Sequence, residues 1–164
     1  MNPDGVTGGN IMEARYKKAT IEDLDLLVDM RIKVLRAANM LSEETDMSEV
    51  RRCSYRYYKE ALCNGSHTAY LVFDGNNVIG TGGASFFQVM PTYHNPSGRK
   101  AYIMNMYTDP VYRRRGVAYK TLDLLVRDIR KCGVSAISLE ATEMGKPLYE
   151  KYGFVKMQNE MELP

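Results

Sequence analysis

The chain has 164 residues, of which 45% are hydrophobic and 26% charged, the balance of an ordinary soluble globular protein. Its net charge of +2 excludes a broadly basic nucleic-acid-binding protein, and no apolar run approaches the ~18 residues that a membrane span requires. The three cysteines, Cys53, Cys63 and Cys132, are an odd number without CxxC spacing, which argues against a disulfide framework and against a zinc site. We therefore expect reduced thiols in a cytoplasmic protein.

The N-terminal segment differs in composition from the rest of the chain. Residues 1–11 combine asparagine, proline, aspartate and several glycines with almost nothing to bury, so we expect a flexible tail. This segment has no basic region followed by an apolar stretch, which argues against a secretory signal. The remaining residues, 12–164, have the length of one domain.

The first half of the chain predicts a strand, two helices and a hairpin. Thr20, with Asp23 three residues later, matches a capping box and predicts the start of the first helix. The second helix should end at Asn64-Gly65 and bury a face made of Val50, Cys53, Tyr57 and Ala61. The expected elements are a strand at 14–18, a helix after Thr20, a helix at 47–63, and strands at 68–73 and 78–90.

The second half alternates strands and helices. The expected elements are a loop at 91–99, a strand at 100–108, a helix ending near Lys131, a strand at 134–141, a helix at 146–152, and a terminal strand or tight hairpin from Phe154. The order is β-α-α-β-β-β-α-β-α-β. Hairpin-paired strands followed by a strand–helix–strand crossover predict a mixed sheet in one α/β, or α+β, domain.

The most informative segment joins the strand at 100–108 to the following helix, and it contains Arg113, Arg114 and Arg115 followed by Gly116, Val117 and Ala118. The first turn of a helix has unpaired N–H groups and partial positive charge, so it can bind a diphosphate. Gly116 would let the backbone approach such a ligand closely, and the arginines would add charge. The alternative is a solvated basic turn without a ligand.

This segment resembles the R/Q-x-x-G-x-G/A signature of the GCN5-related N-acetyltransferases (GNAT), which bind the pyrophosphate of acetyl-CoA there. A second block, Leu148 to Phe154 (LYEKYGF), is similar to the LYEKxGF segment of the same family. The resemblance covers about residues 14–163 and implies a GNAT-like acyl-CoA N-acyltransferase fold. It also implies that Arg113, Arg114, Arg115, Gly116, Val117 and Ala118 bind acetyl-CoA, the acyl donor.

The resemblance implies further roles for individual residues. Tyr149 matches the tyrosine that points at the CoA sulfur, and a phenol with a pKa near 10 holds a proton to give to the leaving thiolate. The main chain of Met106, Tyr107 and Thr108 would bind the pantetheine and polarise the acetyl carbonyl. Thr142 stands where many members have an asparagine that contacts the pantetheine. For Tyr149, simple packing on the sheet is the alternative; for Tyr152, core packing is the better interpretation.

The acceptor side of the site is less defined by the sequence. Arg31 interrupts the apolar stripe of the first helix, where it either packs its stem on the core or binds an acidic or carbonyl group of the acceptor. Asn105 stands where some family members have a glutamate base, and an amide cannot take a proton. Glu140, or water, could accept the proton instead. His94 is expected on the surface of a loop.

The resulting interpretation is an N-acetyltransferase in which a primary amine attacks acetyl-CoA directly in a ternary complex. The acceptor is either a small molecule or a protein amine, and no nucleic acid, membrane or metal is expected. A homodimer is possible because dimers are common in the family. The alternatives are a transferase of another acyl-CoA and a non-catalytic module that binds or senses acyl-CoA.

Overall fold

The computed structural model describes residues 13–164, so the tail expected at 1–11 lies outside the described residues. The strands are β1 (Arg15–Lys18), β2 (His67–Asp74), β3 (Asn77–Gln88), β4 (Arg99–Thr108) and β5 (Ala136–Leu139). The helices are α1 (Leu24–Asn39), α2 (Ser48–Asn64), α3 (Val117–Lys131) and α4 (Lys146–Tyr152). Short 3-10 turns lie at Ile21–Asp23 and Pro110–Tyr112.

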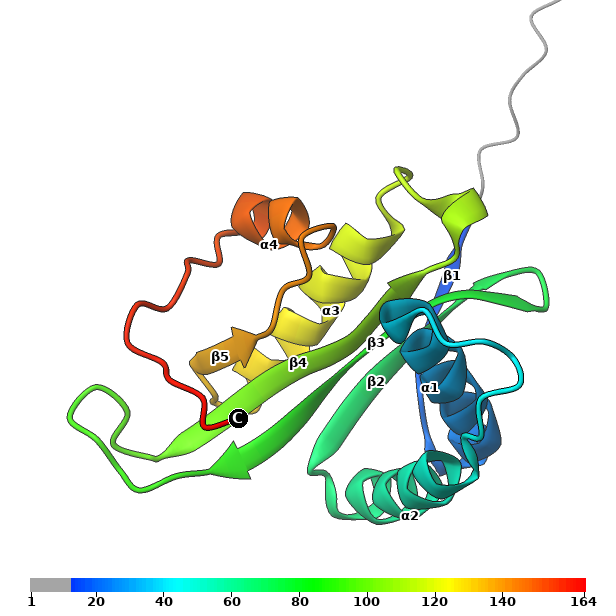
Figure 1. Cartoon of the computed structure of the whole chain (residues 1–164). Helices are drawn as coiled ribbons and strands as arrows, with labels where there is room; N and C mark the ends of the chain where they lie inside the picture. Colours follow the sequence, from blue (N-terminus) through cyan, green and yellow to red (C-terminus); the bar gives the residue numbers. More distant parts are fainter. Residues whose placement is uncertain (1–12) are drawn as a thin grey trace, which may run out of the picture.

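The five strands form one mixed sheet in the order β1-β2-β3-β4-β5. The first three pairings are antiparallel, and only β4 and β5 are parallel. Helices α1 and α2 cover one face of this sheet, while α3 and α4 cover the other (Figure 1). The parallel pair follows from the α3 crossover, because a helix between two strands returns the chain in the same direction. The predicted mixed α/β architecture is confirmed.

The helix boundaries follow local capping signals. The capping box is present: the Thr20 hydroxyl accepts from the backbone N–H of Glu22, and the Thr20 N–H donates to the Asp23 carboxylate at 2.9 Å. It caps the 3-10 turn at Ile21–Asp23, and the α-helix proper begins one turn later, at Leu24. Helix α2 ends at Gly65, whose φ of 75° is the left-handed conformation that glycine adopts readily.

The buried face of α2 differs from the prediction. Tyr58 and Ala61 are buried, whereas Cys53 and Tyr57, predicted as core residues, are exposed. The reason is that Cys53 and Tyr57 line an open pocket above the sheet, so both stay exposed although the Tyr57 ring contacts His67 of β2.

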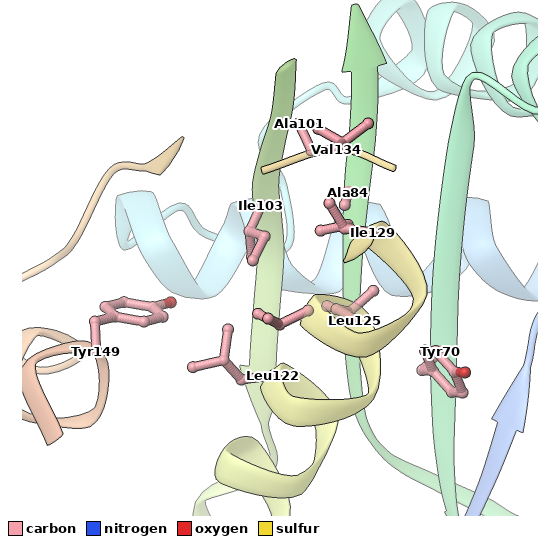
Figure 2. Close-up of a cluster of buried hydrophobic side chains, with 10 residues drawn as sticks. Tyr70, Ala84, Ala101, Ile103, Leu122, Leu125, Ile129, Val134 and Tyr149 are labelled. Carbon is pink, nitrogen blue, oxygen red and sulfur yellow. The ribbon is translucent and has the colours of Figure 1, made fainter. Parts of the chain in front are cut away.

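Each face of the sheet has its own hydrophobic core. On the α3 face, Leu122, Leu125 and Ile129 pack against Ala101 and Ile103 of β4 (Figure 2). The other core joins α1 and α2 to β2, with members that include Leu27, Val28, Tyr58, Leu71 and Phe73. Strand β2 lies between the two cores and is buried along nearly its whole length. The sheet is therefore held rigidly from both sides, which fixes the positions of β3 and β4.

Strand β4 contains a bulge near its C-terminal end. Gly83 pairs with Met104 and Thr81 pairs with Tyr107, so β4 has one residue more than β3 between these pairs. Asn105 adopts a left-handed φ of 58° at this place. Gly82 lies opposite, and an added Cβ there would come within 2.5 Å of the Met106 sulfur. The bulge thus bends β4 while the glycine opposite makes room for the displaced side chain.

The parallel strands β4 and β5 separate after a short pairing. Their ladder runs from Lys100–Ala136 to Ile103–Leu139, where β5 ends, while β4 continues through the bulge to Thr108. The backbone of β4 beyond Ile103 is therefore not bonded to β5. We call the gap between the diverging ends of these two strands, near the N-terminal end of α3, the opening.

The terminal strand predicted from Phe154 is wrong, because residues 153–164 contain no strand. Its side chains Val155, Met161 and Leu163 are almost fully exposed. The adjacent edge strand β5 spans only four residues, fewer than the predicted 134–141, and offers few ladder bonds to a further strand.

Candidate active site

The turn before α3 is an open anion cradle. Gly116 is the N-cap residue with φ 80°; no side chain caps the helix, and its first turn contains no acidic residue. An added Cβ on Gly116 would meet no atom within 4 Å, so the space beside the helix terminus is free. Unpaired N–H groups of the first turn and the helix dipole therefore face an accessible space that fits a diphosphate.

The three arginines of this turn lie on its exposed surface but are arranged differently. The Arg113 Nε donates to the carbonyl oxygen of Thr108 at 3.2 Å, which ties the cradle to the end of β4. Arg115 lies over the ring of Tyr112, with its guanidinium carbon 5.6 Å from the ring centre. Arg114 is exposed, with φ 64°. Val117 is buried and anchors the helix start, while Ala118 is half-buried.

The end of β4 forms one wall of the opening. Met106 packs toward the α3 core, whereas Tyr107 packs toward α1, with the Lys33 ammonium 5.4 Å from its ring centre. The Thr108 hydroxyl oxygen is buried and has no hydrogen-bond partner among the described residues. The backbone of Met106 to Thr108 thus lies next to the cradle, and its polar groups on the β5 side form no ladder bonds with β5.

Tyr149 reaches the same opening from α4. Its ring is buried and is directed toward β4 beside Ile103 and Leu122 (Figure 2). Burial, and then the neighbouring Tyr102, raise the pKa of the Tyr149 phenol above its usual value. The phenol therefore keeps its proton at neutral pH. Tyr152 is only half-buried, and its hydroxyl donates to Asp123 on α3 at 3.0 Å.

Two residues on the loop after β5 are involved in local contacts. The Thr142 hydroxyl accepts from the Gly145 N–H at 3.1 Å, so it stabilises the turn that leads into α4. Glu140 is exposed, and after burial its charge is the next cause that raises the pKa of Tyr102. The Thr142 hydroxyl acts as an acceptor in this turn and retains its proton for donation.

A pocket of about 280 Å³ lies on the opposite face of the sheet, between α1, α2 and the middle of β4. Met104 and Asn105, the residues at the bulge, both line it, together with Arg31 from α1. The Arg31 guanidinium donates to the Asn105 side-chain oxygen at 3.2 Å. The remaining lining residues are Cys53, Ser54, Tyr57, Tyr58, His67 and Ser85. The bulge in β4 is therefore shared by the pocket on one face and the opening on the other.

A small hydrogen-bond network forms the floor of the pocket. The Tyr57 hydroxyl lies 2.9 Å from His67 Nδ1 and 2.6 Å from the Ser85 hydroxyl. His67 is buried, and its Nε2 has no partner among the described residues; an added Cβ on Gly83 would come within 2.7 Å of it. Burial, and then the charge of Arg31, lower the pKa of His67 to about 4. His67 is therefore neutral at physiological pH.

Most of this pocket was not predicted from the sequence. Arg31 was predicted as a candidate, but Tyr57 and Cys53 were predicted to be core residues, and no role was predicted for His67 or Ser85. One usable signal was present on α2, where Ser54 and Tyr58 repeat the i, i+4 spacing of Cys53 and Tyr57 and form one semi-polar face. The strand residues carried no such pattern, because only the β2–β3 pairing brings His67 opposite Ser85.

The mixed sheet, with an uncapped helix N-terminus beside two separating parallel strands, defines an α/β domain with a free anion-binding helix terminus. The Acetyltransferase (GNAT) family model matches residues 35–154, and the chain belongs to this family. No curated protein matches the chain. Within residues 13–164, no helix combines the length and apolar character needed to cross a membrane.

Several solved structures are similar to this chain. A predicted acetyltransferase with acetyl-CoA from Clostridium acetobutylicum is 34% identical, with a TM-score of 0.84 over 92% of this chain and 96% of that one. A GCN5-related N-acetyltransferase from Ralstonia eutropha JMP134 is 24% identical, with a TM-score of 0.78 over 92% and 97%. An aminoglycoside acetyltransferase from an uncultured soil metagenomic sample, in complex with sisomicin, has the same fold at 11% identity, with a TM-score of 0.70 over 92% and 94%.

Proposed function

We propose that this protein is an acetyl-CoA-dependent N-acetyltransferase that acetylates a small primary amine by direct attack in a ternary complex. The observation that carries this proposal is the shared bulge in β4: the opening that fits the acyl donor and the pocket that fits an acceptor meet at Asn105. The similar Clostridium acetobutylicum structure, which contains acetyl-CoA, supports the choice of donor.

Each part of the opening has a role in this proposal. The cradle at Arg113, Arg114, Arg115, Gly116, Val117 and Ala118 binds the diphosphate of the donor. The main chain of Met106 to Thr108 binds the pantetheine, and its N–H groups stabilise negative charge on the acetyl oxygen. The Thr142 hydroxyl accepts from the Gly145 N–H and keeps its own proton, which it can donate to the pantetheine.

The donor supplies an activated acetyl group, and the chain supplies positioning and a proton. The acceptor nitrogen forms a bond to the acetyl carbon while the carbon–sulfur bond breaks. Tyr149 gives its phenolic proton to the departing thiolate and is reprotonated from solvent. Among residues 13–164, no carboxylate lines the pocket, so in this proposal the acceptor ammonium loses its proton to water. Cys63 and Cys132 lie outside the pocket lining, and the Cys53 thiol donates to the Glu49 carboxylate of its own helix, so we propose direct attack instead of a covalent acetyl-enzyme.

The cradle is tested by ligand-induced stabilisation. Saturating acetyl-CoA should raise the melting temperature, because a ligand that binds only the folded state stabilises it. Gly116→Val should remove most of this rise, since its side chain fills the space beside the helix terminus. Gly65→Val is the matched control: it is also a left-handed glycine with free space around it, but it lies at the end of α2. An undiminished rise in folded Gly116→Val protein would overturn the cradle assignment.

Catalysis is tested by a panel of amines in which free thiol release from acetyl-CoA is followed. Turnover with at least one amine separates an enzyme from a module that only binds acyl-CoA. The same assay with propionyl-CoA and succinyl-CoA determines whether acetyl is the preferred group. Binding of acetyl-CoA without turnover of any amine would contradict the proposed function.

A further inference from the structure

We propose that the acceptor is a small amine that also carries an anionic group, a carboxylate or a phosphate, and that Arg31 binds this group. The inference rests on the proposed acetyl transfer and adds to it the chemical class of the acceptor. The observation behind it is that Arg31 lies in a pocket whose lining, within the described part of the chain, includes no acidic residue.

The Arg31 guanidinium is the uncompensated cation of this pocket. It is half-buried, and its hydrogen-bond partner is the neutral side-chain oxygen of Asn105, 3.2 Å away. In the described part of the chain, no carboxylate lies within ion-pair distance of it. By contrast, two arginines of α2 have acidic partners: Arg51 pairs with Asp29 at 2.7 Å and Arg52 with Glu49 at 2.6 Å. A half-buried guanidinium without a counter-ion is costly, and an anionic ligand would remove this cost.

The charge of Arg31 extends into the interior of the pocket. Burial is the main cause that lowers the pKa of His67, and Arg31 lowers it further. Burial raises the pKa of Tyr58 to about 12, and Arg31 opposes this rise. Both effects show that the guanidinium charge lies close to His67 and Tyr58 inside the pocket. A neutral His67 adds no second cation, so the pocket offers one positive site surrounded by hydroxyl and amide groups.

The size and chemistry of the pocket restrict the acceptor further. A volume of about 280 Å³ suits a molecule of amino-acid size better than a large polycation. The planar guanidinium can donate two parallel hydrogen bonds to a carboxylate or a phosphate. The hydroxyls of Ser54, Tyr57 and Ser85 can bind its remaining oxygens. A polyamine or aminoglycoside would instead place positive charge against Arg31.

The alternative role for Arg31 is purely structural, since its bond to Asn105 could serve only to hold the bulge. The two roles predict different kinetics. Loss of a structural contact should reduce turnover of all acceptors to a similar extent. Loss of an anion-binding group should raise KM for anionic acceptors and leave neutral acceptors nearly unchanged.

The test compares acceptors that differ only in the anionic group. Free L-amino acids are compared with their C-terminal amides, and phosphoethanolamine is compared with ethanolamine, by acetyl-CoA-dependent thiol release. For the native protein we expect kcat/KM to favour the anionic member of one pair by about 10- to 100-fold, from the strength of a charge-assisted hydrogen bond. The favoured pair tells carboxylate from phosphate. Arg31→Ala should abolish the preference through KM, and Arg31→Lys should restore part of it.

Arg51→Ala is the matched control, because it removes an arginine of the same helix layer whose ion pair lies outside the pocket lining. It should keep the full preference. A second readout needs no turnover: in the presence of CoA, N-acetyl amino acids should stabilise the native protein more than their amides do, and Arg31→Ala should remove this difference. Equal kcat/KM for both members of each pair would overturn the inference while leaving the acetyltransferase proposal intact. Failure to bind acetyl-CoA would overturn the proposed function itself.

Discussion

The two faces of the sheet carry the two halves of the candidate site, and they are constructed differently. On the α3 face, the cradle and its basic residues lie within one continuous segment, Arg113 to Ala118, and Tyr149 follows on the next helix. On the α1–α2 face, the pocket is assembled from residues as far apart in the chain as Arg31 and Asn105. The first half depends on local backbone geometry, and the second depends on tertiary packing.

This difference has a physical consequence for how each half responds to change. In the proposed donor site, backbone N–H groups would bind the diphosphate whatever the neighbouring side chains are, so the cradle should depend mainly on the conformation of Gly116. The pocket depends on side chains whose charge states are set by burial, as the lowered pKa of His67 shows. We therefore expect the cradle face to control binding and proton transfer, and the pocket face to control acceptor choice and the pH dependence of stability.

The largest expected effect is the loss of turnover in Tyr149→Phe, which separates a catalytic role of this phenol from a packing role of its ring. Tyr149→Phe keeps the buried ring but removes the acid, so kcat should fall about 10- to 1000-fold while the acetyl-CoA Kd stays nearly constant. Steady-state turnover with the best amine of the panel, together with a binding titration, measures both quantities. Tyr152→Phe, three residues further on the same helix, loses only a hydrogen bond to Asp123 and should keep native turnover. Native turnover in Tyr149→Phe would show that water protonates the thiolate.

The second effect concerns stability on the pocket face. His67 has a pKa of about 4 when folded and about 6.5 when unfolded, so the unfolded chain binds the proton first as the pH falls. Its contribution is complete above pH ~6.5 and is lost between pH ~6.5 and pH ~4. Lowering the pH from 7.5 to 5 should reduce the free energy of unfolding by about 2 kcal/mol through this group.

Urea unfolding at the two pH values measures this loss. His67→Asn keeps a polar group near the position of Nδ1 and should remove most of the pH-dependent part, whereas His94→Asn, in the exposed loop, should not. The carboxylates are common to all variants, so the difference between variants isolates the imidazole. If native and His67→Asn proteins lose stability equally over this range, His67 is not held neutral by burial.

The smallest expected effect is the salt dependence of acetyl-CoA binding, which separates the contribution of the arginine side chains from that of the backbone N–H groups. Arg113, Arg114 and Arg115 are exposed, so their attraction for the diphosphate is screened at a Debye length of about 8 Å near 0.15 M salt. The acetyl-CoA Kd should therefore rise several-fold between about 0.05 and 0.5 M sodium chloride. A Kd that does not change with salt would mean that the backbone N–H groups provide nearly all of the affinity.

Local signals in the sequence predicted the helix starts and the turn at Gly116. The capping box at Thr20 before α1, the glycine at 116 before α3 and the segment around Tyr149 on α4 each act within a few residues, so they can be interpreted without knowing the fold. The pocket residues could not be found in this way, because His67 and Ser85 meet only through strand pairing. The buried face of α2 was wrong for the same reason: helical spacing groups Cys53 with Tyr57, but it does not reveal that an open pocket lies above them.

The bulge at Asn105 also makes the number of residues in β4 functionally important. Before it, Ala101 and Ile103 face α3; after it, Met106 takes that side and Tyr107 faces α1, so odd and even positions exchange faces. Deleting Asn105 would remove the extra residue, so Met106 and Tyr107 would keep their faces, but the bend in β4 and the hydrogen bond from Arg31 to Asn105 would be lost. An insertion or deletion here therefore disturbs the donor site and the acceptor site together, whereas the exposed loop at 91–97 can change length without affecting either. Substitutions along β4 could therefore change which acceptor binds, whereas insertions or deletions in this strand would disrupt both the opening and the pocket.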